Sequence, residues 1–82
     1  MTQHLLNDTA VTTASDKVFV DMRREIVEGS IAQGSKISEP ELAKRYGVSR
    51  ATLREALNRL ESCYLVERKA NIGCRVVALT AE

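Results

Sequence analysis

The fold is decided by residues 41–60, which read ELAKRYGVSRATLREALNRL. Two short helices are predicted on either side of Gly47, Val48 and Ser49, because glycine ends helices and serine begins them. Along the second helix, Leu53 and Leu57 recur at the spacing of one helical face. Two helices joined by so tight a turn form a helix-turn-helix, whose second helix suits the major groove of DNA.

Further elements are predicted on both sides of this motif. A first helix is expected over residues 16–28, capped by Ser15 or Asp16 and ended by Gly29. The helix before Gly47 is expected over residues 39–46, and Ser38 and Glu41 form its capping box. The helix after Ser49 is expected over residues 50–63. The apolar face of the first helix is predicted to comprise Phe19, Met22, Ile26 and Val27.

Short strands complete the expected fold. One is predicted at Ile37, and two more, over residues 65–68 and 74–79, form a β-hairpin around a turn at residues 69–73. The fold class is therefore mainly α with a small β-hairpin, a winged helix-turn-helix of three helices plus a wing. Residues 1–14 are expected to form a flexible N-terminal arm, and residues 15–80 the single domain.

Composition excludes several classes of protein. The 82 residues contain 12 Lys and Arg against 11 Asp and Glu, which excludes a nucleic-acid-binding protein of the strongly basic tail type. A membrane-spanning run and a signal peptide are both missing, which predicts a cytoplasmic chain without a membrane partner. The lone histidine, His4, leaves no metal-ligand cluster or paired nucleophile and base, so we expect no metal, no cofactor and no enzyme activity.

The two cysteines, Cys63 and Cys74, are interpreted as small apolar residues of the core or its edge. Both are expected to stay reduced in the cytoplasm, although a disulfide between them is an open alternative. Positive charge is concentrated in residues 41–75, which hold eight Lys and Arg against four Asp and Glu. That asymmetry favours a polyanionic partner for the second half of the chain.

The outer face of the second motif helix has the residue types that contact DNA. Arg50 and Arg54 can each donate two hydrogen bonds to guanine, Thr52 can bond a phosphate, and Ala51 permits close approach. Basic residues also surround the expected hairpin tip, at Arg68, Lys69 and Arg75. The alternative is that these basic residues only form a solvent-exposed surface and contact no partner. The candidate DNA-binding residues are Arg45, Ser49, Arg50, Ala51, Thr52, Arg54, Lys69, Asn71, Gly73 and Arg75.

The string from Glu41 to Leu60 resembles the signature of the GntR family of bacterial transcription regulators. The resemblance extends over residues 17–79 and includes residues 26–31, 34–37 and 65–69. It implies a winged helix-turn-helix that binds palindromic operators as a dimer. It also implies that Arg50 and Arg54 read bases or clamp phosphates, that Thr52 contacts the backbone, and that Gly73 lies in the wing tip.

Two departures from the family pattern affect that expectation. Many members carry a basic residue where this chain has Glu39 or Pro40, and a Pro and an Arg where it has Ala70 and Ile72. Members also usually continue into a C-terminal domain that binds a metabolite and forms the dimer. We expect this chain to lack that domain, either as a fragment of a longer protein or as a naturally short one.

The predicted function is sequence-specific binding of double-stranded DNA by a transcription regulator. The third helix is expected in the major groove, with the wing on the backbone or in the minor groove, and a homodimer in the full-length protein. The alternative is a winged helix that contacts another protein. That alternative predicts exposed apolar residues on the outer face of the third helix, where the sequence places Arg50 and Arg54.

Overall fold

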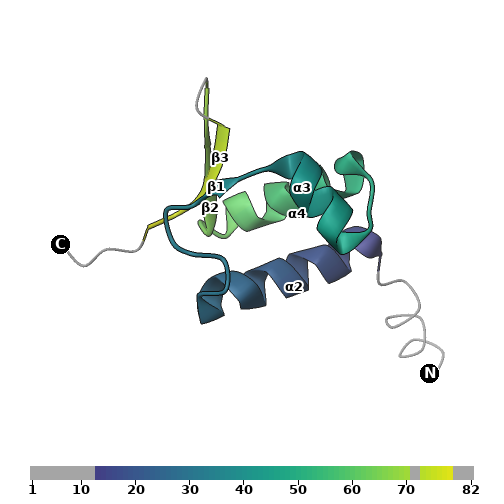
Figure 1. Ribbon diagram of the computed structural model, residues 1–82, viewed down its shortest axis with the longest axis horizontal. Coiled ribbons are helices and arrows are strands. Elements are labelled where there is room, and N and C mark those ends of the chain that lie inside the picture. The colour runs from purple at the N-terminus through teal and green to yellow at the C-terminus, as the bar shows by residue number, and fades with distance from the viewer. Residues whose placement is uncertain (1–12, 71–72, 79–82) are drawn as a thin grey trace.

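The computed structural model describes residues 13–70 and 73–78. Figure 1 shows α2 beneath α3 and α4, and the β2–β3 hairpin, called the wing below, rising on the other side of α4. The three helices and the wing confirm the expected fold class. The elements in chain order are α2 (Ala14–Glu28), β1 (Lys36–Ile37), α3 (Glu39–Tyr46), α4 (Arg50–Ser62), β2 (Val66–Lys69) and β3 (Gly73–Val76).

The start of α2 corrects the sequence prediction. Its N-cap is Thr13, because the Thr13 hydroxyl accepts from the Asp16 N–H (3.1 Å) and the Asp16 carboxylate accepts from the Thr13 N–H (3.2 Å). This reciprocal pair satisfies two donors, which a cap at Ser15 or Asp16 would not do. The Thr13 N–H holds the pKa of Asp16 below its ordinary value. Of the expected flexible arm, only residues 13 and 14 are described, and both belong to this helix start.

The helix-turn-helix has the predicted boundaries, except that α4 ends at Ser62, one residue before the predicted end. Ser38 caps α3 by accepting from the Glu41 N–H at 3.4 Å, and Pro40 lies in the first turn, where its missing N–H costs little. Gly47 ends α3 in a left-handed conformation (φ 70°) that a side chain would strain. Ser49 caps α4 by accepting from the Thr52 N–H at 3.0 Å.

The three strands form one antiparallel sheet in the order β1–β3–β2. Within the wing, Val66 pairs with Val76 and Lys69 pairs with Gly73. The expected last strand is too long, since β3 ends at Val76; the predicted end at Leu79 and the turn residues 71–72 lie outside the described residues. Pairing of β1 with β3, at Lys36 and Arg75, is an addition that the sequence did not indicate.

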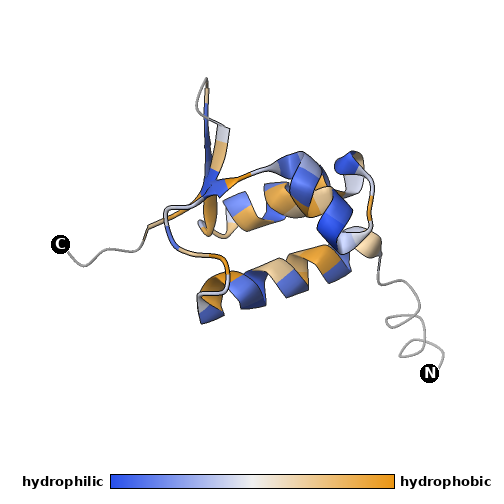
Figure 2. Cartoon of the chain, in the orientation of Figure 1, coloured by the Kyte–Doolittle hydropathy of each residue, from blue (hydrophilic) through white to orange (hydrophobic). Residues whose placement is uncertain are grey.

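The core lies between α2, α4 and the inner face of the sheet. Figure 2 shows that the hydrophobic residues of α2 and α4 lie on the sides of the two helices that face each other. Val27 is a wrong prediction, because its side chain is 74% exposed and Val18 is buried instead. Successive residues of a helix are about 100° apart around its axis, so Val27 lies off the face that carries Phe19, Met22 and Ile26. The fully buried side chains are Met22, Leu53, Leu57, Leu60, Val66 and Val76.

The two cysteines lie in different surroundings. Cys74 is buried in the core, as expected, and burial raises the pKa of its thiol. Cys63 is exposed at the end of α4, so its assignment to the core or its edge is wrong. Both thiols are free. Among the described helices, none is long and apolar enough to cross a membrane.

Candidate nucleic-acid interface

The N-terminal half of α4 presents three of the predicted contact residues together. Arg50, Ala51 and Arg54 are exposed, while Leu53 and Leu57 on the opposite face are completely buried. Burial of the leucines fixes the rotation of the helix about its own axis. The exposed face, which carries Arg50, Ala51 and Arg54, is therefore held outward.

Ser49 and Thr52 form the capped end of this helix. The Ser49 hydroxyl accepts from the Thr52 N–H and donates to the Thr52 hydroxyl, both at 3.0 Å. Thr52 is half-buried. Its hydroxyl is oriented by the hydrogen bond that it accepts from Ser49. The structure thus places both residues beside Arg50 in sequence and gives Ser49 a structural role as the N-cap of α4.

Arg54 carries an ion pair that the sequence did not indicate. Its Nη2 donates to Oε1 of Glu39, in the first turn of α3, at 3.1 Å. The Glu39 side chain is 22% exposed and the Arg54 side chain 54% exposed. Spacing in sequence gives no signal for this contact, because it depends on the crossing of two helices.

The wing brings fewer basic residues to its tip than expected. Lys69 is exposed at the last residue of β2, opposite the exposed Gly73 with its φ of 97°. Arg68 turns instead toward α4, where its Nη1 donates to Oδ1 of Asn58 at 2.8 Å. Asn71 lies outside the described residues.

Arg75 lies along the wing rather than at its tip. It occupies the central strand, flanked by Lys36 on β1 and Glu67 on β2. The residue is half-buried, and its Nε is buried without a hydrogen-bond partner among the described residues.

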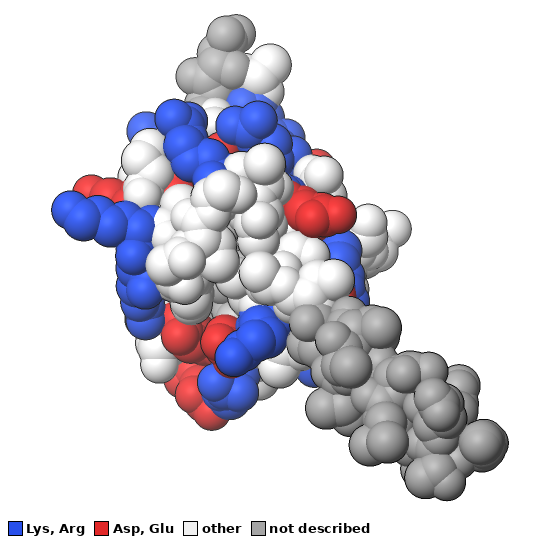
Figure 3. Space-filling view, turned by 90° about the vertical axis from the view of Figure 1, so that its right-hand side faces the viewer, with Lys and Arg blue, Asp and Glu red and all other residues white. Residues whose placement is uncertain are grey.

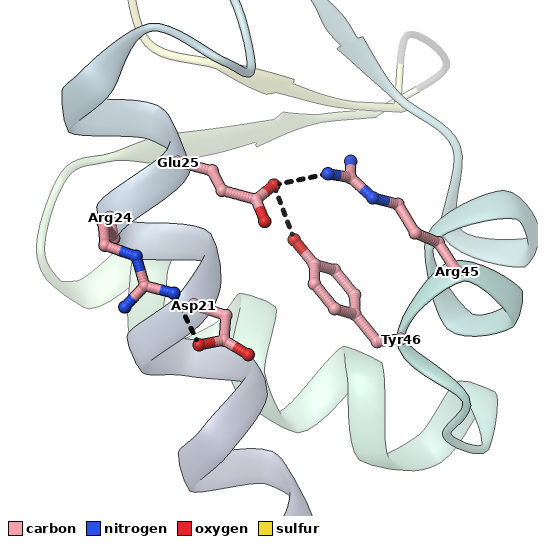
Figure 4. A network of polar contacts seen from close by, with 5 residues as sticks. All are labelled: Asp21, Arg24, Glu25, Arg45 and Tyr46. Atoms are coloured by element: carbon pink, nitrogen blue, oxygen red, sulfur yellow. Dashed lines mark hydrogen bonds and ion pairs between the residues drawn. The ribbon is translucent and has the colours of Figure 1, made fainter.

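Arg45 belongs to a network on the other side of α3 (Figure 4). One oxygen of Glu25, on α2, accepts from Arg45 Nη2 at 2.9 Å and from the Tyr46 hydroxyl at 3.1 Å. Burial, followed by the hydrogen bond to Glu25, raises the pKa of Tyr46 to about 12, so its hydroxyl remains a donor at neutral pH. The structure therefore separates Arg45 from Arg50 and Arg54 and ties α3 to α2 through it.

Two open grooves separate α3 from the wing. One, of about 530 Å³, is lined by residues that include Glu39, Pro40, Arg50 and Gly73. The other, of about 300 Å³, reaches Lys69 and again includes Glu39 and Gly73. Figure 3, which views the right-hand side of Figure 1, shows Lys and Arg gathered toward the wing at the top and mixed charges lower down, toward α2. The exposed basic residues of this surface thus include Arg50 and Arg54 on α4 and Lys69 on the wing.

Two short helices joined at a left-handed glycine, with a hairpin beside the second helix, define a winged helix-turn-helix domain. The model of the family described as "Bacterial regulatory proteins, gntR family" matches residues 14–76. The chain belongs to this gntR family of bacterial regulatory proteins.

Relatives and solved structures agree with that assignment. The chain is 36% identical over 72 residues to the uncharacterized HTH-type transcriptional regulator BphR of Paraburkholderia xenovorans, covering 88% of this chain and 29% of BphR. It is 38% identical over 64 residues to the gluconate operon transcriptional repressor of Bacillus licheniformis, covering 78% of this chain and 26% of the repressor. It thus spans less than a third of these relatives.

Two crystal structures show the same fold. A putative transcriptional regulator GntR from Rhodococcus sp. RHA1 superimposes with a TM-score of 0.75 at 33% identity, over 80% of this chain and 32% of that one. The AraR DBD in complex with operator ORR3 superimposes with a TM-score of 0.70 at 32% identity, over 78% of both chains.

Proposed function

We propose that this chain is the sequence-specific DNA-binding domain of a transcription regulator, acting in the bacterial cytoplasm. α4 enters the major groove and the wing follows the backbone or the minor groove. The observation that carries the proposal is the outward face of α4, where Arg50, Ala51 and Arg54 are all exposed. Arginine in that setting donates two parallel hydrogen bonds to guanine O6 and N7.

The wing supplies the second contact. Lys69 is exposed beside the tip and carries a charge that a phosphate attracts without regard to sequence. The likeness to the AraR DBD in complex with an operator supports binding of this chain to an operator. Phosphate contacts of this kind make binding strongly dependent on salt.

The full-length protein is proposed to bind a palindromic operator as a homodimer. A single domain with few phosphate contacts binds weakly, and two copies on two half-sites add their free energies of binding. The part of the protein that would pair the two copies is proposed to lie in sequence that the relatives have and this chain does not span.

A protein-binding winged helix is the competing function, and the surface disfavours it. Among the described residues, the large hydrophobic side chains that are exposed are Val20, Val27 and Tyr64. Two are on α2 and one follows α4, so the outer face of α4 remains polar. A protein partner would need apolar surface on that face.

The test begins with selection of a binding sequence from a random duplex library at near-physiological salt. On the selected duplex, Arg54→Ala is expected to weaken binding by about 1–3 kcal/mol, because a base contact is lost. Arg24→Ala is the matched control, since Arg24 also donates to a carboxylate at 3.1 Å but lies on α2. The proposal fails if no sequence is enriched even by an artificially dimerised domain, or if both variants bind like the original chain.

A further inference from the structure

Glu39 is an acidic residue in a surface whose other charged lining residues are all basic. It lines both grooves between α3 and the wing, together with Arg50 in one and with Arg68 and Lys69 in the other. Its carboxylate accepts from Arg54 at 3.1 Å. A carboxylate at this place repels DNA phosphates, so its presence weakens general attraction to DNA.

The cost to general binding has a compensation in geometry. A guanidinium has five donors in a rigid fork, and Glu39 occupies one Nη2 donor of Arg54. A long side chain that is already held in one orientation loses less conformational freedom when it meets a base edge. It also adapts less readily to a wrong base or to a phosphate.

We propose that Glu39 is a positioning residue that sets the base preference of Arg54. Its carboxylate holds the guanidinium toward the base edge, and its charge keeps phosphates out of the groove between α3 and the wing. This inference rests on the proposed DNA-binding function. It assigns specificity to a residue that acts through another, by combining an attractive contact with a repulsive one.

The test compares Glu39→Gln and Glu39→Ala with the unchanged 82-residue chain. Affinity is measured at one salt concentration for the selected duplex, for duplexes altered at the base pair whose preference Arg54→Ala abolishes, and for a scrambled duplex. Glu41→Gln is the matched control, because it removes the same charge from the same first turn of α3. The side chain of Glu41 is exposed, whereas that of Glu39 is half-buried. Circular dichroism establishes that each variant is folded.

Both Glu39 variants are expected to bind the scrambled duplex about two- to fivefold more tightly, because a unit charge near phosphates is removed. They are also expected to lose at least about threefold of the preference at the Arg54-dependent base pair, as coupled neighbours do. Glu41→Gln is expected to keep that preference. In the Arg54→Ala background, Glu39→Ala should change no base preference.

Three results separate the possible failures. If Arg54→Ala leaves binding to the selected duplex unchanged, the proposed interface itself is wrong. If Arg54→Ala weakens binding but the Glu39 variants shift all duplexes by one common factor, Glu39 is only a surface charge. If Glu39→Ala still alters base preference in the Arg54→Ala background, Glu39 reads a base directly and does not act through Arg54.

Discussion

Lys69 is the exposed basic residue that the described part of the wing places beside its tip, while Arg68 is directed to Asn58. Its ammonium is a mobile point charge rather than a planar fork, so it suits a phosphate better than a base edge. Lys69 and Arg54 are therefore expected to contribute in different ways, although both carry one positive charge.

Lys69→Ala is expected to weaken binding to all duplexes by a similar factor and to reduce the slope of log affinity against log salt by about 1. The measurement is a salt titration on the selected and scrambled duplexes. A loss confined to one base pair of the selected duplex would contradict this and would mean that the wing reads sequence.

At the scale of elements, the junction between α4 and β2 contains the one non-glycine residue of the described backbone that has a positive φ. Tyr64 adopts a left-handed conformation (φ 63°), in which its N–H bonds to Glu61 O at 2.9 Å and the next N–H, of Leu65, bonds to Leu60 O at 3.0 Å. This is the Schellman pattern, whose left-handed position is usually a glycine. The tyrosine side chain is 81% exposed.

Tyr64→Gly is expected to raise the free energy of unfolding by about 1 kcal/mol, because the left-handed strain of a residue with a Cβ is removed. Urea denaturation measures the change, and Tyr64→Ala is the control that removes the side chain but keeps the strain. A glycine variant less stable than the alanine variant would show that backbone flexibility in the unfolded chain outweighs the strain.

At the scale of the whole molecule, the polar and apolar surfaces lie at opposite ends of α4. The basic face surrounds the N-terminal half of α4. An apolar groove of about 140 Å³ lies past its C-terminal end, lined by residues that include Val27, Tyr64 and Val77. Figure 1 shows the C-terminal ends of α2 and α4 on the same side of the molecule. A change at the apolar end therefore leaves the proposed DNA contacts in place.

Local patterns in the sequence predicted what depends on neighbours along the chain. The boundaries of α3, the start of α4, the caps at Ser38 and Ser49, and the left-handed Gly47 all belong to this group. The pairing of β1 with β3 and the contact between Glu39 and Arg54 did not follow, because both join segments far apart in sequence. Asn71 lies outside the described residues, so its place in the wing stays a prediction, as do the DNA-contacting roles of all the proposed contact residues.

The central position of β3 has a consequence for how fast backbone amides exchange with solvent. The base of the wing is held from both sides: Val76 N–H bonds to Ser35 O and Gly34 N–H bonds to Val76 O, each at 2.9 Å. At the other end, Gly73 pairs with Lys69 alone among the strand partners described. Local opening should therefore begin at the tip.

Hydrogen exchange followed by NMR is expected to show the Val76 amide at least about tenfold slower than the Gly73 amide. Equal rates would mean that the hairpin opens as one unit. If exchange slows from Gly73 to Val76 as expected, the base of the wing is fixed and its Lys69–Gly73 end is adaptable. That end can then adjust to the width of a groove without loosening the helices.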